Sequence, residues 1–518
     1  MADQAVPLVS PHQQPGQLKA GAALSYAAMV AGFLVAMVFT PVMLRLLGQT
    51  EYGLYSLVAS LASYLGMLGL VVNSTYLRLY ARYRATREEA EIARANGLLL
   101  LMMTGLGVIT LVVAVVLAAN ARTILGNNLS ADELARGRDL ILILGGGAAV
   151  SLPLSVFESH VIAKERFVFQ KVLAISRTIL GPAVIAPVLL AGHGSVGMAW
   201  VTVAANLAVQ ALTAAYSMRT LRMRFTFTGI RLTLLRETTV FSSFVLLSVV
   251  IDQINWNVDK YIVGWFWGTA AVAVYGVASV LNLYFMSLSS AVSTVFAPRV
   301  HNMVASETGD RALSLLFARV GRIQFALLAG ALIEFVIFGR EFLVFWAGPA
   351  YESAYFIALL LMIPAVVPLI QNLGVEIQRA KNLHKFRAIV YSMVAIVNVL
   401  ASIFLVRALG PVGAAIGTAL SLLIGNGIIM NWYYASRVGL DLRHFWSQIV
   451  RMIPSLLAPT IVGLIFVWFC DTTRLIVFVA GILVVGFVYV VSVWCLGLDA
   501  SERSLVRTPL ARFRRGGS

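Results

Sequence analysis

Runs of about twenty apolar residues, separated by short polar segments, recur along the whole chain. A helix of that length crosses the hydrocarbon core of a bilayer, which is about 30 Å thick, because each residue adds about 1.5 Å. The pattern predicts an all-α polytopic membrane protein with about fourteen transmembrane helices. These helices are expected near residues 21–44, 52–73, 97–119, 140–162, 168–190, 196–217, 241–266, 271–295, 320–338, 354–376, 386–406, 411–434, 450–469 and 476–496.

The composition supports this class. Only 12% of the 518 residues are charged and 60% are hydrophobic, whereas soluble domains carry about 25% charged residues. The net charge of +16 could indicate a nucleic-acid-binding protein. The excess is better explained by Lys and Arg in short loops on one side of the membrane, so no nucleic-acid partner is expected.

The distribution of positive charge predicts the orientation. If the N-terminus is cytoplasmic, about thirty of the 39 Lys and Arg residues fall in cytoplasmic segments and only about seven on the opposite side. One misplaced helix would scramble this alternation downstream. We therefore expect a multi-pass protein of the bacterial inner membrane with both termini in the cytoplasm.

The chain also contains an internal repeat. Gly48 to Tyr55 recurs as Gly268 to Tyr275, and Val196 to Thr202 recurs as Val412 to Thr418, at similar offsets. The repeat predicts two parallel halves of about six helices each. The basic, amphipathic pattern of 222–237 favours an interfacial linker helix over an ordinary loop. The expected organisation is an N-terminal tail (1–20), an N-lobe (21–220), the linker helix (221–240), a C-lobe (241–440), two further helices (441–497) and a basic tail (498–518).

Polar residues inside the predicted spans are the main functional candidates, because they are costly in hydrocarbon. Asp252, Asn255 and Asp259 fall on one face of the span 241–266, and Lys260 flanks them. Asp252 lies about 16 Å from the start of that span, near the expected membrane midplane. These residues could relay protons or Na+ or contact sugar hydroxyls; a structural ion pair is the alternative. Glu334 in the span 320–338 is a further candidate for the transport pathway.

Four arginines could bind a diphosphate group, which requires several strong donors in a partly desolvated pocket. They are Arg78, Arg82, Arg177 and Arg379. The competing interpretation is ordinary anchoring at the cytoplasmic face. No catalytic constellation, phosphate-binding loop or metal-ligand spacing is found in the sequence, so we expect no enzyme activity, no metal and no cofactor.

Four segments together resemble the polysaccharide and O-antigen flippases, a branch of the multidrug/oligosaccharidyl-lipid/polysaccharide exporter superfamily. The resemblance covers residues 20–440 and is carried by Leu47–Tyr55, Val258–Gly264 with Val274–Gly276, Phe296–Arg299 and Gly410–Thr418. It implies two lobes around a central cavity and transport by alternating access.

The same resemblance implies that the substrate is a polyprenyl-diphosphate-linked oligosaccharide, moved from the cytoplasmic to the outer leaflet for envelope or exopolysaccharide synthesis. The implied partners are membrane lipids, a polysaccharide polymerase and glycosyltransferases. Two alternatives stay open, namely an ion-coupled multidrug antiporter and a membrane glycan-modifying enzyme. The two helices expected after residue 441 argue against the first, and the short outer loops argue against the second.

Overall fold

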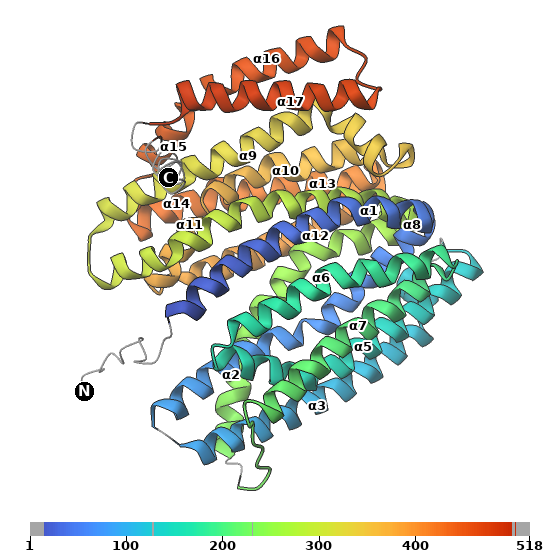
Figure 1. Ribbon diagram of the computed structural model, residues 1–518, viewed down its shortest axis with the longest axis vertical. Coiled ribbons are helices and arrows are strands. Elements are labelled where there is room, and N and C mark those ends of the chain that lie inside the picture. The colour runs from blue at the N-terminus through green and yellow to red at the C-terminus, as the bar shows by residue number, and fades with distance from the viewer. Residues whose placement is uncertain (1–14, 87, 127–128, 230–231, 500–502, 504–518) are drawn as a thin grey trace, which may run out of the picture. The chain divides into compact units, whose positions relative to one another are not determined.

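The computed structural model describes residues 15–86, 88–126, 129–229, 232–499 and 503 (Figure 1). These residues form helices and connecting turns, with no strand among them, so the all-α prediction is confirmed. Most of the two predicted tails, 1–20 and 498–518, lies outside the described residues.

The chain divides into two compact units, Met1–Ala273 and Val274–Ser518. The predicted lobe boundaries near residues 220 and 440 stay predictions. The first unit contains α1 (Pro15–Gly66), α2 (Leu68–Ala85), α3 (Glu89–Ala119), α4 (Ala121–Leu125), α5 (Ala131–Ala163), α6 (Phe167–Leu190), α7 (Gly194–Arg219) and the first part of α8 (Leu232–Ala305).

The second unit contains the rest of α8 and all later helices. These are α9 (Asp310–Trp346), η1 (Pro349–Tyr351), α10 (Ala354–Ile370), α11 (Asn372–Ala380), α12 (His384–Leu409), α13 (Pro411–Leu422), η2 (Leu423–Met430), α14 (Asn431–Tyr433), η3 (Tyr434–Val438), α15 (Leu442–Val450), α16 (Pro454–Phe469), α17 (Leu475–Ser492) and η4 (Val493–Gly497).

Among the described residues, ten helices are long and apolar enough to cross a membrane, or eleven if α10 and α11, bent by 40°, form one span. Of these ten, α8 contains two of the predicted spans, and α1 contains the first predicted span and most of the second, which runs on into α2. The protein is therefore a multi-pass membrane protein. The number of fourteen crossings and the internal repeat stay predictions.

Single glycines break α1 and α8 at corresponding positions of the sequence repeat. Gly48 has φ 74° and ψ 171°, and Gly268 has φ 78° and ψ −175°. This backbone region is essentially restricted to glycine, because a β-carbon would clash with the neighbouring backbone. The sequence similarity between the two segments is therefore explained by a shared sharp turn between successive helices.

Replacing Gly48 by alanine should destabilise the fold through local backbone strain alone, because no atom beyond the adjoining backbone lies within 4 Å of the added β-carbon. We expect the free energy of unfolding to fall by about 1–3 kcal/mol, measured on purified protein. Gly105→Ala is the matched control, because its β-carbon also meets open space and its φ is not positive. Equal stability of the two variants would contradict the strain argument.

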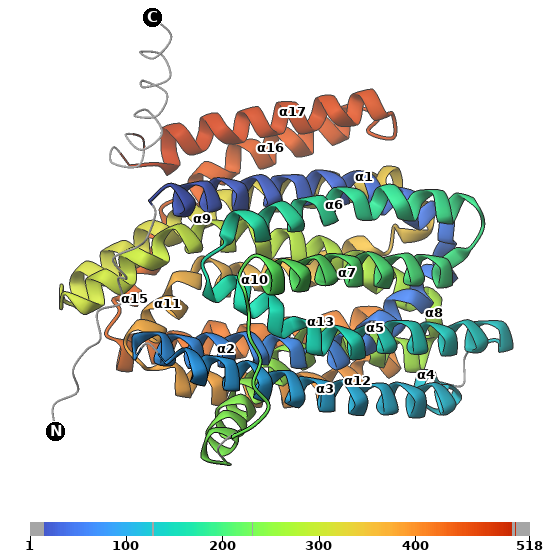
Figure 2. The ribbon, with the colours of Figure 1, turned by 60° about the horizontal axis from the view of Figure 1, so that its bottom comes forward.

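The core of the first unit joins α2, α3, α5 and α7. Tyr76, Leu99 and Val156 are at most 2% exposed and lie in one continuous apolar cluster. Figure 2 shows α3 and α5 running side by side, where Gly107 lets the two backbones approach closely. Small residues serve this purpose in membranes, since lipid gives no hydrophobic driving force for helix association.

In the second unit, the terminal pair α16 and α17 packs on α9. Phe338 of α9 contacts Phe466 and Phe478 edge to face, and Val485 completes this buried cluster. The two helices run side by side in both ribbon views (Figures 1 and 2). The last predicted pair of helices is thus an integral part of the second unit.

The prediction of a linker helix over 222–237 is wrong for the first half of that segment. Residues 222–229 are not helical, Arg222 has φ 51°, and α8 begins only at Leu232. The reason is that the backbone of this segment bonds to α3. The Thr226 amide donates to the Ala93 carbonyl at 2.9 Å, and the Arg224 carbonyl accepts from the Asn96 side chain at 2.8 Å.

Candidate functional site

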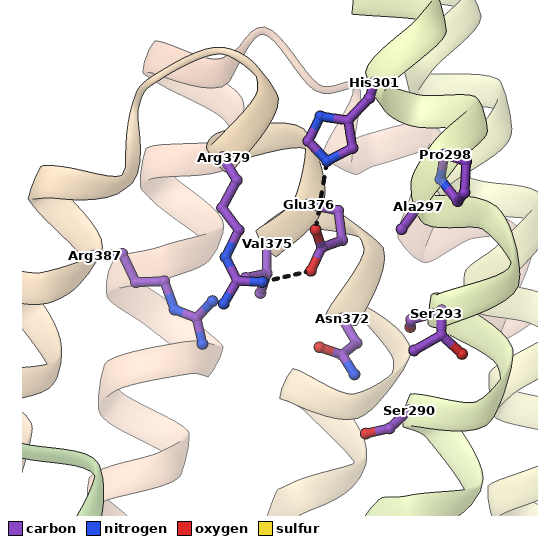
Figure 3. A pocket seen from close by; sticks show the side chains of 11 residues that line it. Ser290, Ser293, Ala297, Pro298, His301, Asn372, Val375, Glu376, Arg379 and Arg387 are labelled. Carbon is purple, nitrogen blue, oxygen red and sulfur yellow. Dashed lines mark hydrogen bonds and ion pairs between the residues drawn. The ribbon is translucent and has the colours of Figure 1, made fainter. Parts of the chain in front are cut away.

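A basic pocket of about 470 Å³ lies in the second unit, between the end of α8, the short helix α11 and the start of α12 (Figure 3). Its charged lining consists of His301 from α8, Glu376 and Arg379 from α11, and Arg387 from α12. Hydroxyl and amide groups complete the wall, from Ser290, Ser293, Thr294 and Asn372.

The position of α11 follows from its amphipathic sequence. Leu373, Gly374 and Ile377 are buried on one face, and a β-carbon at Gly374 would meet the Tyr434 ring at 2.9 Å. The opposite face carries Glu376 and Arg379, which point into the pocket (Figure 3). Because Gly374 has no side chain, α11 packs closely against its neighbours, and the polar face of α11 is directed toward the pocket.

An acidic residue partly neutralises this pocket. Arg379 donates to Glu376 Oε1 at 2.8 Å, and His301 Nε2 lies 3.8 Å from Glu376 Oε2. The Arg387 guanidinium lies 4.6 Å from the centre of the Tyr391 ring, a cation–π contact that holds its position. Two guanidinium groups beside hydroxyl and amide donors make the pocket suitable for a phosphate-bearing ligand.

Sequence reasoning predicted only part of this pocket. Arg379 was among the candidate diphosphate ligands, whereas Arg387 and His301 were not among the candidates. A local signal was available, since Asn372, Glu376 and Arg379 follow at i, i+4 and i+7 and so share one helix face. Nothing in the sequence brings His301 or Arg387 to that face.

The other three candidate arginines lie in the first unit and are exposed: Arg78 and Arg82 on α2, and Arg177 on α6. Arg82 lies over the Tyr83 ring at 5.7 Å. The structure therefore does not place these three in the basic pocket, which belongs to the second unit.

The polar stripe of α8 packs partly against α1 inside the first unit. The Ser63 hydroxyl donates to Gln253 Oε1 at 3.3 Å, and Tyr64 donates to the Gln253 carbonyl at 3.3 Å. Asn257 Nδ2 also donates to Gln253 Oε1, at 2.6 Å. Gln253 therefore anchors this part of α8, a role that no motif or spacing in the sequence indicates.

The predicted pathway residues of α8 have different environments. Asp259 is 3% exposed, Lys260 is partly buried, and the Asn255 amide nitrogen is buried without a hydrogen-bond partner. The side chain of Asp252 lies outside the described part of the structure.

Glu334 faces the terminal helix pair. Both of its carboxylate oxygens are buried without a hydrogen-bond partner, and a β-carbon at Gly486 of α17 would lie 3.3 Å from Glu334 Oε1. It does not line the basic pocket.

A chain of buried hydrogen bonds joins four segments of the first unit. Tyr76 donates to Asn96 Oδ1 at 2.8 Å, and its hydroxyl oxygen lies 2.6 Å from His160 Nδ1. Asn96 in turn donates to the Arg224 carbonyl. Because the Tyr76 proton is directed at Asn96, the tautomer with hydrogen on Nδ1 of His160 completes the chain.

Replacing Tyr76 by phenylalanine should leave Asn96 and His160 buried without this partner. We expect the free energy of unfolding to fall by about 1–3 kcal/mol, measured by thermal or denaturant unfolding. Tyr80→Phe is the matched control, because Tyr80 also stacks on this cluster through its ring. If the two variants lose the same stability, the hydroxyl chain does not hold these segments together.

Comparison of sequences finds a family model described as polysaccharide biosynthesis protein, which matches residues 18–304. A search of curated protein sequences finds no match.

Comparison of structures finds the same architecture in solved transporters. A lipid II flippase MurJ in an inward closed conformation has a TM-score of 0.74 and 14% identity, over 92% of this chain and 98% of that chain. An inward-facing multidrug resistance MATE family transporter of the MOP superfamily has a TM-score of 0.60 and 14% identity, over 81% and 98%. A Vibrio cholerae MATE transporter has a TM-score of 0.56 and 15% identity, over 82% and 99%. At these identities the likeness shows the fold alone.

Proposed function

Because this chain belongs to the family of polysaccharide biosynthesis proteins, we propose that it is a flippase for a polyprenyl-diphosphate-linked oligosaccharide. In this proposal it moves the substrate from the cytoplasmic to the outer leaflet by alternating access, for envelope or exopolysaccharide synthesis. The supporting comparisons are to membrane transporters, and their fold extends over most of this chain.

The basic pocket of the second unit is the observation that carries the substrate assignment. A diphosphate presents several anionic oxygens, and Arg379 and Arg387 supply planar, permanently charged donors for them. The side chains of Ser290, Ser293 and Asn372 add neutral donors to the same cavity. On the predicted topology, the pocket lies toward the cytoplasmic side, where such a substrate would be loaded.

The decisive experiment deletes the gene in its host and follows the lipid-linked saccharide. We expect surface polysaccharide to be lost while the lipid-linked precursor accumulates, and the wild-type gene to restore export. Purified protein in liposomes should expose a fluorescent undecaprenyl-diphosphate-linked oligosaccharide to an external, membrane-impermeant reagent. Normal export in the deletion strain, together with no exposure in liposomes, would overturn the proposal.

An ion-coupled multidrug antiporter is the second candidate, since MATE transporters share the fold. It predicts that the deletion strain keeps its surface polysaccharide and becomes sensitive to cationic drugs. A glycan-modifying enzyme is less well supported, because the proteins that match this chain in fold are transporters.

We further propose that transport is coupled to protons or Na+ through Asp252, as the position of this carboxylate near the centre of its predicted span suggests. Asp252→Asn keeps the shape of the side chain and removes its charge. The variant should reach the membrane at normal levels and lose most transport, measured by complementation with quantified protein. Normal export by this variant at normal abundance would show that the charge is not needed.

A further inference from the structure

The first unit contains a second polar cavity, of about 260 Å³. It lies between the end of α1, α2, α5 and α7, so it is separate from the basic pocket of the second unit. Two glycines, Gly66 and Gly69, leave room for it. A β-carbon at Gly66 would have no neighbour within 4 Å, and one at Gly69 would meet its nearest atoms only at 3.9 Å.

The wall of this cavity is rich in hydrogen-bond acceptors. Asn73 Oδ1 and Gln210 Oε1 are both buried without a hydrogen-bond partner. The Ser155 hydroxyl donates to the Leu152 carbonyl at 2.6 Å, which leaves its lone pairs free to accept. Glu158 is exposed and also lines the cavity, which therefore reaches the surface.

The charges of this cavity are opposite to those of the basic pocket. Glu158 is the charged residue among the described residues that line it, and no Lys, Arg or His side chain is among them. A diphosphate would therefore meet carboxylate and carbonyl oxygens with no cationic partner, which is unfavourable. The ligand that fits is one that donates many hydrogen bonds and carries no negative charge.

The volume of the cavity restricts which uncharged or cationic ligands can fill it. At about 30 Å³ per water, it holds the volume of roughly eight or nine water molecules, far more than a single alkali cation needs. A pyranose ring with its hydroxyl groups fits within a cavity of this volume. Its hydroxyls would satisfy the Asn73 and Gln210 oxygens after a rotation of the terminal amide torsion, which is soft.

We propose that this cavity binds one neutral monosaccharide unit of the transported saccharide. The inference rests on the proposed function and adds to it a sugar site, in the first unit, that is distinct from the pocket proposed for the diphosphate. Buried polar groups left without hydrogen-bond partners are unfavourable. A sugar that satisfies two of them gains binding free energy and discriminates against ligands without hydroxyl donors.

The test measures binding of simple sugars to the purified full-length protein in nanodiscs free of sugar-based detergent. The probes are methyl glycosides of glucose, galactose, mannose and N-acetylglucosamine. Their binding is measured by saturation-transfer NMR and by the shift of the protein's unfolding midpoint. We expect saturable binding of at least one glycoside. Two comparison ligands test the alternatives. NaCl, with KCl as its reference, tests for a cation site, and ethidium tests for a cationic-drug site.

Two kinds of variant locate the binding. Gly66→Leu should place a side chain in the cavity, since its β-carbon would have no neighbour within 4 Å, and weaken glycoside binding at least about tenfold. The unfolding midpoint of this variant is measured in parallel. Asn73→Leu should also abolish binding. Asn206→Leu, on α7 but outside the cavity lining, is the matched control and should bind normally.

The outcomes separate this inference from the proposed function. If wild-type protein exposes the lipid-linked oligosaccharide in liposomes, but no glycoside binds and Gly66→Leu transports normally, the sugar site is wrong and the flippase proposal stands. Stabilisation by Na+ or ethidium that depends on Asn73, without glycoside binding, also overturns the sugar site. If glycosides bind as expected but no lipid-linked substrate is moved, the flippase proposal fails.

Discussion

Replacing both Arg379 and Arg387 by alanine is expected to abolish transport while the protein still folds. Arg379 is well exposed and Arg387 half-buried, both at the basic pocket, so neither is required for the apolar core. Each charge-assisted hydrogen bond to a phosphate contributes about 1.5–3 kcal/mol, so each arginine should account for roughly a 10- to 100-fold effect. The measurement is restoration of polysaccharide export in the deletion strain, with membrane protein quantified in parallel.

The control for this prediction is the pair Arg437→Ala and Arg443→Ala. It removes the same charge from exposed positions of the second unit that do not line the pocket. Export should be nearly unchanged in that variant. Equal losses in both double variants would mean that the positive charge of the protein, and not this pocket, matters.

A substitution at Glu376 is expected to strengthen substrate binding, whereas the two arginine substitutions weaken it. The Glu376 carboxylate accepts a hydrogen bond from Arg379 and lies 3.8 Å from His301 Nε2. Glu376→Gln should therefore raise the affinity for the diphosphate substrate, because less competition remains for the Arg379 guanidinium. Weaker binding in this variant would indicate that Glu376 positions Arg379 and does not compete with the ligand.

Replacing Gly53 by leucine is expected to prevent folding. A β-carbon at Gly53 would overlap the backbone carbonyl of Thr269 in α8 and approach the Ala273 amide nitrogen to 3.2 Å. Because backbone cannot move aside as a flexible side chain can, the two helices must separate. Overpacking of this kind costs about 1–3 kcal/mol or more, and the variant adds a whole side chain.

The measurement for Gly53→Leu is the amount of folded, monodisperse protein extracted from membranes. Gly32→Leu is the matched control on the same helix, because nothing lies within 4 Å of its β-carbon. Normal yield of Gly53→Leu would contradict the close packing of α1 on α8. The prediction also gives a structural meaning to the family-like segment Leu47–Tyr55, in which Gly48 forms the turn and Gly53 the contact.

The sequence by itself determined the class of the molecule and the approximate positions of most of its long helices. In hydrocarbon every backbone polar group must be satisfied within its own segment, so a long apolar run dictates a helix whatever its neighbours. The turns at Gly48 and Gly268 also left a signal in the sequence, because the two segments resemble each other there. Only glycine readily adopts the backbone conformation of these turns. These features depend on residues close together in the chain.

The tertiary structure alone decided which polar side chains share a site. His301, Glu376 and Arg387 come from three helices, and the sequence treats each as an ordinary residue of a helix end. Asn73 and Gln210 likewise meet at one cavity from α2 and α7. Helical periodicity fixes the face on which a residue lies, but not which other helix covers that face.

The linker between α7 and α8 illustrates the same limit. Its amphipathic pattern favoured a helix, yet the Arg224 carbonyl and the Thr226 amide bond to α3 and so are not available for helical hydrogen bonds. The local sequence pattern predicts a helix only by comparison with a solvent-exposed loop, because it carries no information about distant hydrogen-bond partners. The competing partners, Ala93 and Asn96, lie far away in the sequence and become neighbours only when the first unit packs.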